Sequence, residues 1–146
     1  MKIQTIARIV SAGMLVLPLL SQTAPQMTVY KTRTCGCCSL WIEHLKGNGF
    51  NVAVQEVDST AEYEKRYGVP RQLQSCHTAV VNGYAIEGHV PAREIHRLLK
   101  EKPSAKGLAV PGMPMGSPGM EGSRKEAYSV MLFDAQGRSS VYQRYP

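Results

Sequence analysis

The hydrophobic and polar positions after residue 26 alternate between two periods, which predict a series of strands and helices. Residues 27–32 alternate between apolar and polar side chains and are rich in β-branched residues, as expected of a strand. Residues 50–57 alternate again and predict a second strand. Between them, apolar residues recur at i, i+3, i+4 and i+7, and this spacing predicts a short helix that ends at the glycines of residues 47–49. The residues of this apolar stripe are Cys38, Trp41, Ile42 and Leu45.

The middle of the chain predicts a second helix, a hairpin and a third helix. The S-x-x-E spacing of residues 59–62 is that of a capping box, and it opens a helix that stops at Gly68. Two short alternating runs flank residues 82–83, an Asn-Gly dipeptide that favours the tight turn of a β-hairpin. Pro91 then opens a helix with an inward apolar face, and Pro103 closes it.

The predicted order, β-α-β-α-β-β-α, is the layout of thioredoxins and glutaredoxins, with a CxxC motif between the first strand and the first helix. Beyond it, residues 107–122 form a loop rich in Gly, Pro and Met, and residues 126–145 suggest a closing hairpin. We therefore predict an α/β (α+β) fold: a thioredoxin/glutaredoxin-like central sheet flanked by helices, with an added C-terminal Met-rich loop and β-hairpin. The length suits one domain, over residues 27–146.

The N-terminal residues 1–24 predict a cleaved signal peptide. Two basic residues precede an apolar run, residues 9–20, which is too short to span a bilayer comfortably. No clean A-x-A motif marks the cleavage site, and Pro25 disfavours cleavage after Ala24, so an uncleaved anchor is the alternative. Export would place the protein in the periplasm, an oxidising compartment, with no stable membrane insertion after cleavage.

The charge of the chain argues against a nucleic-acid partner. Lys and Arg number 17 against 11 Asp and Glu, which gives a net charge of +6. These charges are dispersed in segments of mixed sign, and no basic block is interleaved with aromatic residues. We therefore expect no binding to nucleic acid.

Three of the four cysteines, Cys35, Cys37 and Cys38, open the first predicted helix. A helix N-terminus favours the thiolate, which is both a nucleophile and a metal ligand. A structural disulfide scaffold is disfavoured because adjacent cysteines bridge only with strain. A dithiol oxidoreductase would use Cys35 and Cys38 and leave Cys37 without a role. A metal site uses all three, because thiolates on one turn can converge on a soft ion.

The fourth cysteine falls in a position that faces the dithiol. An alignment on the third strand of glutaredoxins puts Cys76 and His77 in the place of their cis-proline, so we expect one of them near Cys35. His77 is either a ligand or a core histidine. His89, at the end of a predicted strand, has either a ligand or supporting role at the metal, or a capping or core role.

Three methionines lie close together in the Gly/Pro-rich loop: Met113, Met115 and Met120. They either seal the loop as hydrophobic filler or supply thioether ligands. Thioethers bind Cu(I) far better than Zn(II), so the combination of Cys, Met and His favours copper. The two separated CxxC pairs of a zinc ribbon are absent from the sequence. The other histidines, His44 and His96, lie on predicted helices and are interpreted as surface residues.

Three segments together resemble the CopG family of periplasmic copper-resistance proteins: CGCCSLWIEHL, GVPRQLQSCHTAVVNGYAIEGHVP and GLAVPGMPMGSPGMEG. The resemblance runs from about residue 27 to the C-terminus. It implies a thioredoxin-like fold that binds several copper ions through a CxCC motif, and a role in copper tolerance that can include a change in the oxidation state of copper. The metal-ligand candidates that it carries over to this chain are Cys35, Cys37, Cys38, Cys76, His77, His89, Met113 and Met120.

Taken together, these features predict an exported protein for copper resistance or homeostasis that holds Cu(I), as a multinuclear thiolate-bridged cluster. The expected partners are copper ions and other periplasmic copper-handling proteins. Two alternatives stay open. One is a periplasmic thiol-disulfide oxidoreductase that uses Cys35 and Cys38, and the other is a copper chaperone that passes the metal to another protein.

Overall fold

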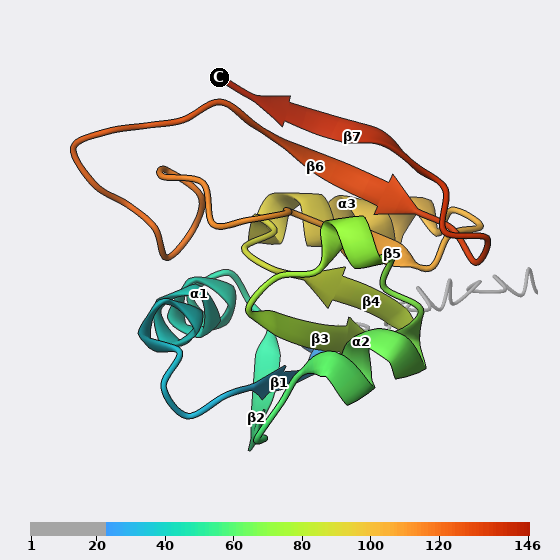
Figure 1. Cartoon of the computed structure of the whole chain (residues 1–146), viewed down its shortest axis with the longest axis horizontal. Helices are drawn as coiled ribbons and strands as arrows, with labels where there is room; N and C mark the ends of the chain where they lie inside the picture. The colour runs from blue at the N-terminus through green and yellow to red at the C-terminus, as the bar shows by residue number, and fades with distance from the viewer. Residues whose placement is uncertain (1–22) are drawn as a thin grey trace, which may run out of the picture.

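A computed structural model describes residues 23–146 and shows a mixed seven-stranded sheet with three α-helices in that part of the chain (Figure 1). The predicted signal peptide lies almost wholly outside the described residues. The strands are β1 Gln26–Lys31, β2 Asn51–Glu56, β3 His77–Val81, β4 Tyr84–Glu87, β5 Gly107–Ala109, β6 Tyr128–Phe133 and β7 Ser139–Tyr145. The helices are α1 Gly36–Gly47, α2 Ala61–Tyr67 and α3 Ala92–Glu101, with a 3₁₀ turn, η1, at Arg71–Leu73. Within residues 23–146, no helix has the length and apolar character needed to cross a membrane.

The strands follow the order β2-β1-β3-β4-β5-β6-β7 across the sheet. β1 is parallel to β2, β3 is antiparallel to both β1 and β4, and β5 is parallel to β4. The hairpin of β6 and β7 extends the sheet through antiparallel pairing of β6 with β5. The predicted strands and helices are all present, and the prediction of a mixed α+β fold is confirmed.

β5 was not predicted, because its three residues were assigned to the Met-rich loop. A strand of three residues, all buried, shows no alternation that a periodicity argument can detect. Its first residue, Gly107, lies against the backbone of Ala85, where a Cβ atom would overlap the carbonyl group. The absence of a side chain at this position therefore permits the close pairing of β4 with β5.

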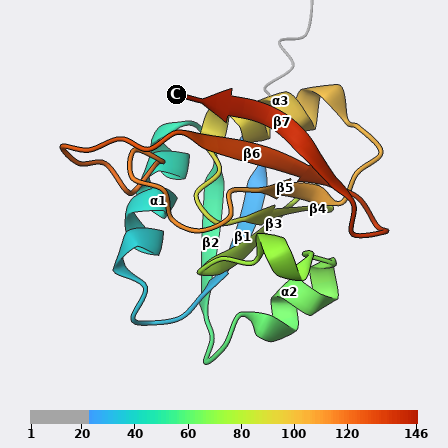
Figure 2. The same ribbon diagram turned by 45° about the horizontal axis from the view of Figure 1, so that its top comes forward.

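Successive strand residues contribute to two buried clusters on opposite faces of the sheet, as the two-residue period of a strand requires. Ile86, Leu108 and Val130 pack in the cluster that includes the apolar stripes of α1 and α3. Their neighbours Ala85 and Ala109 pack in the smaller cluster with residues that follow α2. The helices α1 and α3 thus cover one face, and α2 with η1 covers the other (Figure 2).

The structure contains the predicted Asn-Gly turn between β3 and β4, but not the predicted capping box before α2. Residues 82–83 both have positive φ, 47° and 83°, as the predicted Asn-Gly turn requires. The capping box before α2 does not close. The Ser59 hydroxyl accepts the N–H of Ala61, but Glu62 pairs with Arg66 one turn later instead of bonding back to the cap.

One end of the sheet gathers the segments that carry the candidate ligands. Lys31, the last residue of β1, is paired with His77, the first residue of β3, so the loop before α1 lies beside the residues before β3. β4 and β5 run parallel to β1 and end on the same side. In both Figure 1 and Figure 2 the loop after β5 passes beside α1. The topology thus brings the CxCC motif, Cys76, His89 and the Met-rich loop together.

Candidate metal centre

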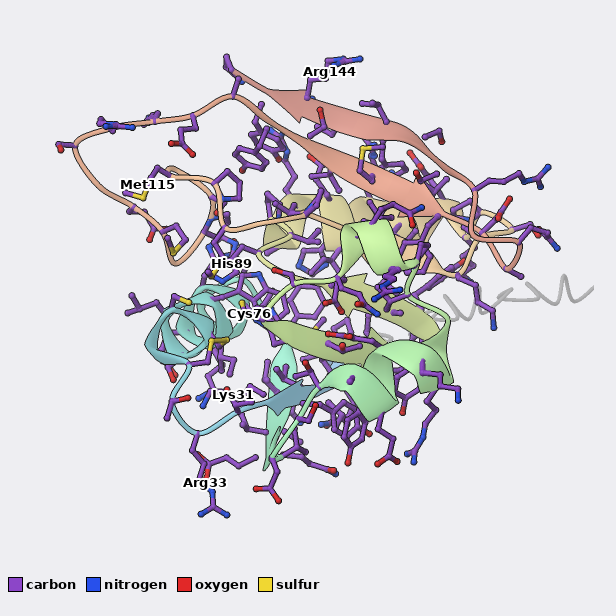
Figure 3. The ribbon with its side chains drawn as sticks, viewed as in Figure 1. Lys31, Arg33, Cys76, His89, Met115 and Arg144 are labelled. Atoms are coloured by element: carbon purple, nitrogen blue, oxygen red, sulfur yellow. A yellow bond between two sulfur atoms is a disulfide. The ribbon has the colours of Figure 1, made fainter. Side chains whose placement is uncertain are left out.

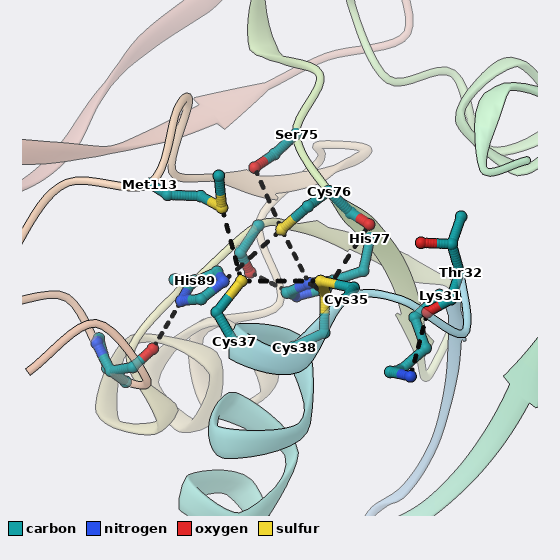
Figure 4. Close-up of a disulfide and its surroundings, with 12 residues drawn as sticks. Lys31, Thr32, Cys35, Cys37, Cys38, Ser75, Cys76, His77, His89 and Met113 are labelled. Carbon is teal, nitrogen blue, oxygen red and sulfur yellow. Dashed lines mark hydrogen bonds between the residues drawn. A yellow bond between two sulfur atoms is a disulfide. The ribbon is translucent and has the colours of Figure 1, made fainter.

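The cysteines of the CxCC motif lie at the start of α1. Cys35 is the N-cap residue, Cys37 and Cys38 belong to the first turn, and no acidic residue is present in that turn. The sulfur atoms therefore lie in the positive field of the helix N-terminus. Cys35 and Cys38 are joined by a disulfide, while Cys37 is a free thiol whose Sγ lies 3.7 Å from the Sγ of Cys35 (Figure 4).

Cys76 completes the sulfur cluster from the residue before β3. The sulfur atoms of Cys35, Cys37, Cys38 and Cys76 all lie within 4.8 Å of one another, as we expected from the placement of Cys76 opposite the dithiol. Burial, with a smaller contribution from nearby Cys37, raises the pKa of the Cys76 thiol to about 11. Cys76 is therefore protonated at neutral pH in the absence of metal, and a metal that binds it must displace this proton.

His77 presents one ring nitrogen to the sulfur cluster. Its Nε2–H donates to the carbonyl oxygen of Gly88 over 3.0 Å, which assigns the proton to Nε2 because a carbonyl only accepts. The unprotonated Nδ1 then lies 3.2 Å from the Sγ of Cys38 and 3.5 Å from the Sγ of Cys76. Burial is the main cause that lowers the pKa of His77 to about 3, so the ring is neutral and its Nδ1 can coordinate a metal.

His89 is arranged in the same way from the opposite side. Its Nδ1–H donates to the carbonyl oxygen of Pro118 over 2.8 Å, and its Nε2 lies 3.6 Å from the Sγ of Cys76. Burial lowers the pKa of His89 as well, so this ring is also neutral at pH 7. A backbone carbonyl that holds the second nitrogen is the usual support of a metal-binding histidine. His89 could therefore offer its Nε2 to a metal that also binds Cys76.

Only one of the candidate methionines has a thioether contact with the cluster among the described contacts. The Sδ of Met113 lies 3.6 Å from the Sγ of Cys37, and the side chain is half exposed. The contacts found for Met120 are backbone hydrogen bonds of a turn. Met115 lies farther out along the same loop, away from Cys76 (Figure 3). Met113 is therefore the thioether that can reach a metal bound at the cysteines.

The Met-rich loop rests directly on the first turns of α1. Gly119 has φ of +85°, and a Cβ there would lie 2.8 Å from the backbone nitrogen of Trp41 and 3.0 Å from the carbonyl oxygen of Cys37. The carboxylate of Glu121 accepts the N–H of Gly119. This close approach places Pro118, the preceding residue, where its carbonyl oxygen accepts the proton of His89.

Glu87, which the sequence analysis did not single out, anchors the chain on both sides of Cys76 and His77. Glu87 is fully buried, and the oxygen atoms of its carboxyl group accept the N–H of Ser75 over 2.6 Å and the hydroxyl of Thr78 over 2.8 Å. These two hydrogen bonds bracket Cys76 and His77 in the chain. Burial raises the pKa of Glu87 to about 8. Its inward place in the alternation of β4, on the same face as Ala85, is the signal from which an anchoring role could have been suspected.

The remaining histidines lie outside the cluster. His96 is exposed and donates to the carbonyl oxygen of Asn48, in agreement with the surface role predicted for it. His44 differs from the prediction. It is half-buried, and its Nε2 accepts the N–H of Ala92 over 3.1 Å, so it satisfies a free donor at the start of α3.

Two solved structures share this fold. Each is described as copper resistance protein CopG, in a form 1 and a form 2, and each is 45% identical to this chain. The first covers 83% of this chain and 97% of its own length with a TM-score of 0.79, and the second covers 84% and 98% with a TM-score of 0.77. The chain belongs to the CopG family.

A second comparison covers a shorter part of this CopG family member. A family model described as "Protein of unknown function, DUF411" matches residues 73–120, which include Cys76, both histidines of the cluster and Met113. The CxCC motif lies outside the matched segment, on α1. A search of curated proteins finds no match.

Proposed function

We propose that this CopG family protein is an exported, periplasmic copper-binding protein that holds Cu(I) as a multinuclear thiolate-bridged cluster and protects the cell from copper. The observation that carries the proposal is the convergence of four cysteine sulfurs in one group and of Cys76, His77 and His89 in a second, with Cys76 common to both. The name of the two solved structures, copper resistance protein, supports copper as the metal.

The types of ligand support Cu(I) over harder ions. Thiolates, a thioether and neutral imidazoles are soft or borderline donors, whereas no carboxylate belongs to either group of ligand atoms within residues 23–146. Met113 adds a donor that Zn(II) rarely uses. The chemistry of the site thus agrees with the copper expected from the sequence.

The number of donors supports more than one ion. A single Cu(I) is satisfied by two or three soft ligands, whereas this site offers four sulfurs and two imidazole nitrogens in one small volume. Several thiolates at one helix end would also concentrate negative charge that one Cu(I) neutralises only in part. Bridging sulfurs remove both difficulties, because each can bind two metals. Cys37, which lies between the disulfide and Met113, is the proposed bridging ligand.

The Cys35–Cys38 disulfide favours a second candidate function, a thiol-disulfide oxidoreductase. The same bond gives the copper protein a redox chemistry. Closing the disulfide from two thiols releases two protons to solvent and two electrons, and the electrons can reduce two Cu(II) to two Cu(I). Redox cycling of copper is therefore included in the proposal, and transfer of copper to another periplasmic protein is the third candidate.

Metal analysis of the native protein separates these functions. The protein is isolated without oxygen from copper-stressed cells, and its copper content is compared with that of a Cys37→Ser/Cys76→Ser variant prepared in parallel. The copper protein is expected to carry copper well above the variant's background. A metal-free wild-type protein that rapidly reduces the disulfides of insulin would instead establish the oxidoreductase.

A further inference from the structure

Part of the cluster does not depend on the cysteines of the disulfide. In the disulfide, the sulfur atoms of Cys35 and Cys38 are no longer thiolates and are poor metal ligands. Cys76, His77 and His89 still offer one thiol and two imidazole nitrogens, and these three atoms lie within 4.8 Å of one another. Both histidines are fully buried and Cys76 is half-buried.

The three side chains have too few protons between them for every unprotonated ring nitrogen to accept a hydrogen bond. His77 donates its only ring proton to Gly88, and His89 donates its only ring proton to Pro118. The two remaining ring nitrogens, at 3.5 Å and 3.6 Å, both face the single S–H of Cys76. One proton serves one nitrogen, so the other buried acceptor faces only sulfur lone pairs. A cation among the three atoms would satisfy both nitrogens and the thiolate together.

The spacing of the donors matches that of ligands around one ion. A sulfur and a nitrogen bound at about 2.0–2.3 Å from a metal, at an angle near 110–120°, lie roughly 3.6–3.8 Å apart. The observed separations of 3.5 Å and 3.6 Å are close to this value. Both rings are held in place by backbone carbonyls, so an ion can bind there with little movement of the ligands. The free thiol of Cys37 donates instead to Met113.

We infer that the disulfide form of the protein retains a site for a single Cu(I), formed by Cys76, His77 and His89. The inference rests on the proposed function, because the proposed function is what identifies the metal of the cluster as copper. A dithiol that reduces the Cys35–Cys38 disulfide gives it two electrons and two protons, becomes a disulfide itself, and adds two thiols to the same site. Copper capacity then has two levels, one ion in the disulfide form and several in the reduced form.

A Cu(I) titration of the disulfide form tests the inference. Alkylation and mass measurement first verify two free thiols per chain, and the protein is then titrated without oxygen against a competing Cu(I) chelator. We expect an endpoint of one Cu(I) per chain. Cys76→Ser and His89→Gln should each weaken this binding on the order of 100-fold. His96→Gln, a matched change at an exposed histidine outside the cluster, should leave it unchanged.

A second measurement reads the ligands directly and does not depend on the variants. In the wild-type disulfide form, nitrogen NMR shifts should change on addition of Cu(I) at Nδ1 of His77 and Nε2 of His89, and not at His96. Failure to retain Cu(I), unchanged binding in Cys76→Ser, or closure of a second disulfide between Cys37 and Cys76 would overturn the inference. The reduced protein, titrated separately, tests the proposed function: several Cu(I) there and none in the disulfide form would overturn this inference alone.

Discussion

The Nε2 atom of His89 lies 3.6 Å from the Sγ of Cys76, across the space between the end of β4 and the start of β3. The other ring nitrogen of His89 donates to Pro118 in the Met-rich loop. This one imidazole therefore connects the sulfur cluster to the loop that rests on α1, and the position of the loop determines which nitrogen faces the cysteines.

The contact between the loop and α1 predicts a large effect of a small substitution. Gly119→Ala should lower the free energy of unfolding by about 1–3 kcal/mol, because the new Cβ would lie 2.8 Å from the Trp41 nitrogen at a φ of +85°. Urea denaturation of the metal-free protein measures this change. Gly137→Ala is the control, since Gly137 has a φ of +75° but no atom within 4 Å of the added Cβ. Equal losses in both variants would show that the loop does not rest on the helix as described.

The thioether of Met113 should affect copper and not stability. Met113→Leu removes the sulfur 3.6 Å from Cys37, and we expect Cu(I) retention against a chelator to weaken by roughly tenfold. The side chain is 46% exposed, so the free energy of unfolding should change by no more than about 0.5 kcal/mol. Met115→Leu, in the outer part of the loop, is the matched control. A Met115→Leu protein that loses copper equally would mean that the loop methionines act without regard to position.

The buried histidines predict how stability depends on pH. Burial lowers the pKa of His77 to about 3, whereas the unfolded chain binds this proton near pH 6.5. Stability is therefore fully present above about pH 6.5 and is lost as the pH falls toward 3, because the unfolded state takes up a proton that the folded state does not. Urea midpoints of the metal-free protein at several pH values should show this decrease. The decrease should be smaller in His77→Gln and unchanged in His96→Gln; equal slopes in all three proteins would contradict the prediction.

Copper binding should become tighter as the pH rises. The pKa of the Cys76 thiol is raised to about 11, so between about pH 6 and 8 an incoming Cu(I) replaces a proton there. The apparent affinity should rise about tenfold per pH unit for each proton displaced. Chelator competition with the reduced protein at three pH values measures the slope. Replacement of Cys76 by Ser should reduce the slope by about one proton, and an unchanged slope would show that Cys76 is not a ligand.

Periodicity in the sequence was sufficient for most of the fold. The i, i+3, i+4, i+7 stripe that includes Trp41 and Leu45 predicted α1, and the Asn-Gly dipeptide predicted the hairpin of β3 and β4. β5 was missed because three consecutive buried residues carry no period, and its existence depends on pairing with β4 and β6, which are remote from it in sequence. The capping box before α2 failed because Glu62 has a competing partner in Arg66 on the next turn.

The candidate site was predictable only in part. The proximity of Cys76 to the CxCC motif was predicted from the alignment with the third strand of glutaredoxins, and the structure accounts for it, because the residues before β3 lie beside the end of β1. The roles of Gly88 and Pro118 could not be predicted from the sequence. Their backbone carbonyls accept the ring protons of His77 and His89, and every residue type carries such a carbonyl. Sequence reasoning kept both Met113 and Met120 as ligand candidates and could not separate them, because backbone turns decide that Met113 points toward Cys37.

If four thiols and two imidazoles form one copper site for several ions, a Cu(I) titration of the fully reduced protein will show it. The titration is done without oxygen against a competing chelator, in parallel for the wild-type protein, for Cys37→Ser and for Ser39→Ala, a neighbouring exposed position on α1. We expect an endpoint above one Cu(I) per chain, a lower endpoint in Cys37→Ser, and no change in Ser39→Ala. An endpoint of one Cu(I) per chain that Cys37→Ser leaves unchanged would contradict the cluster.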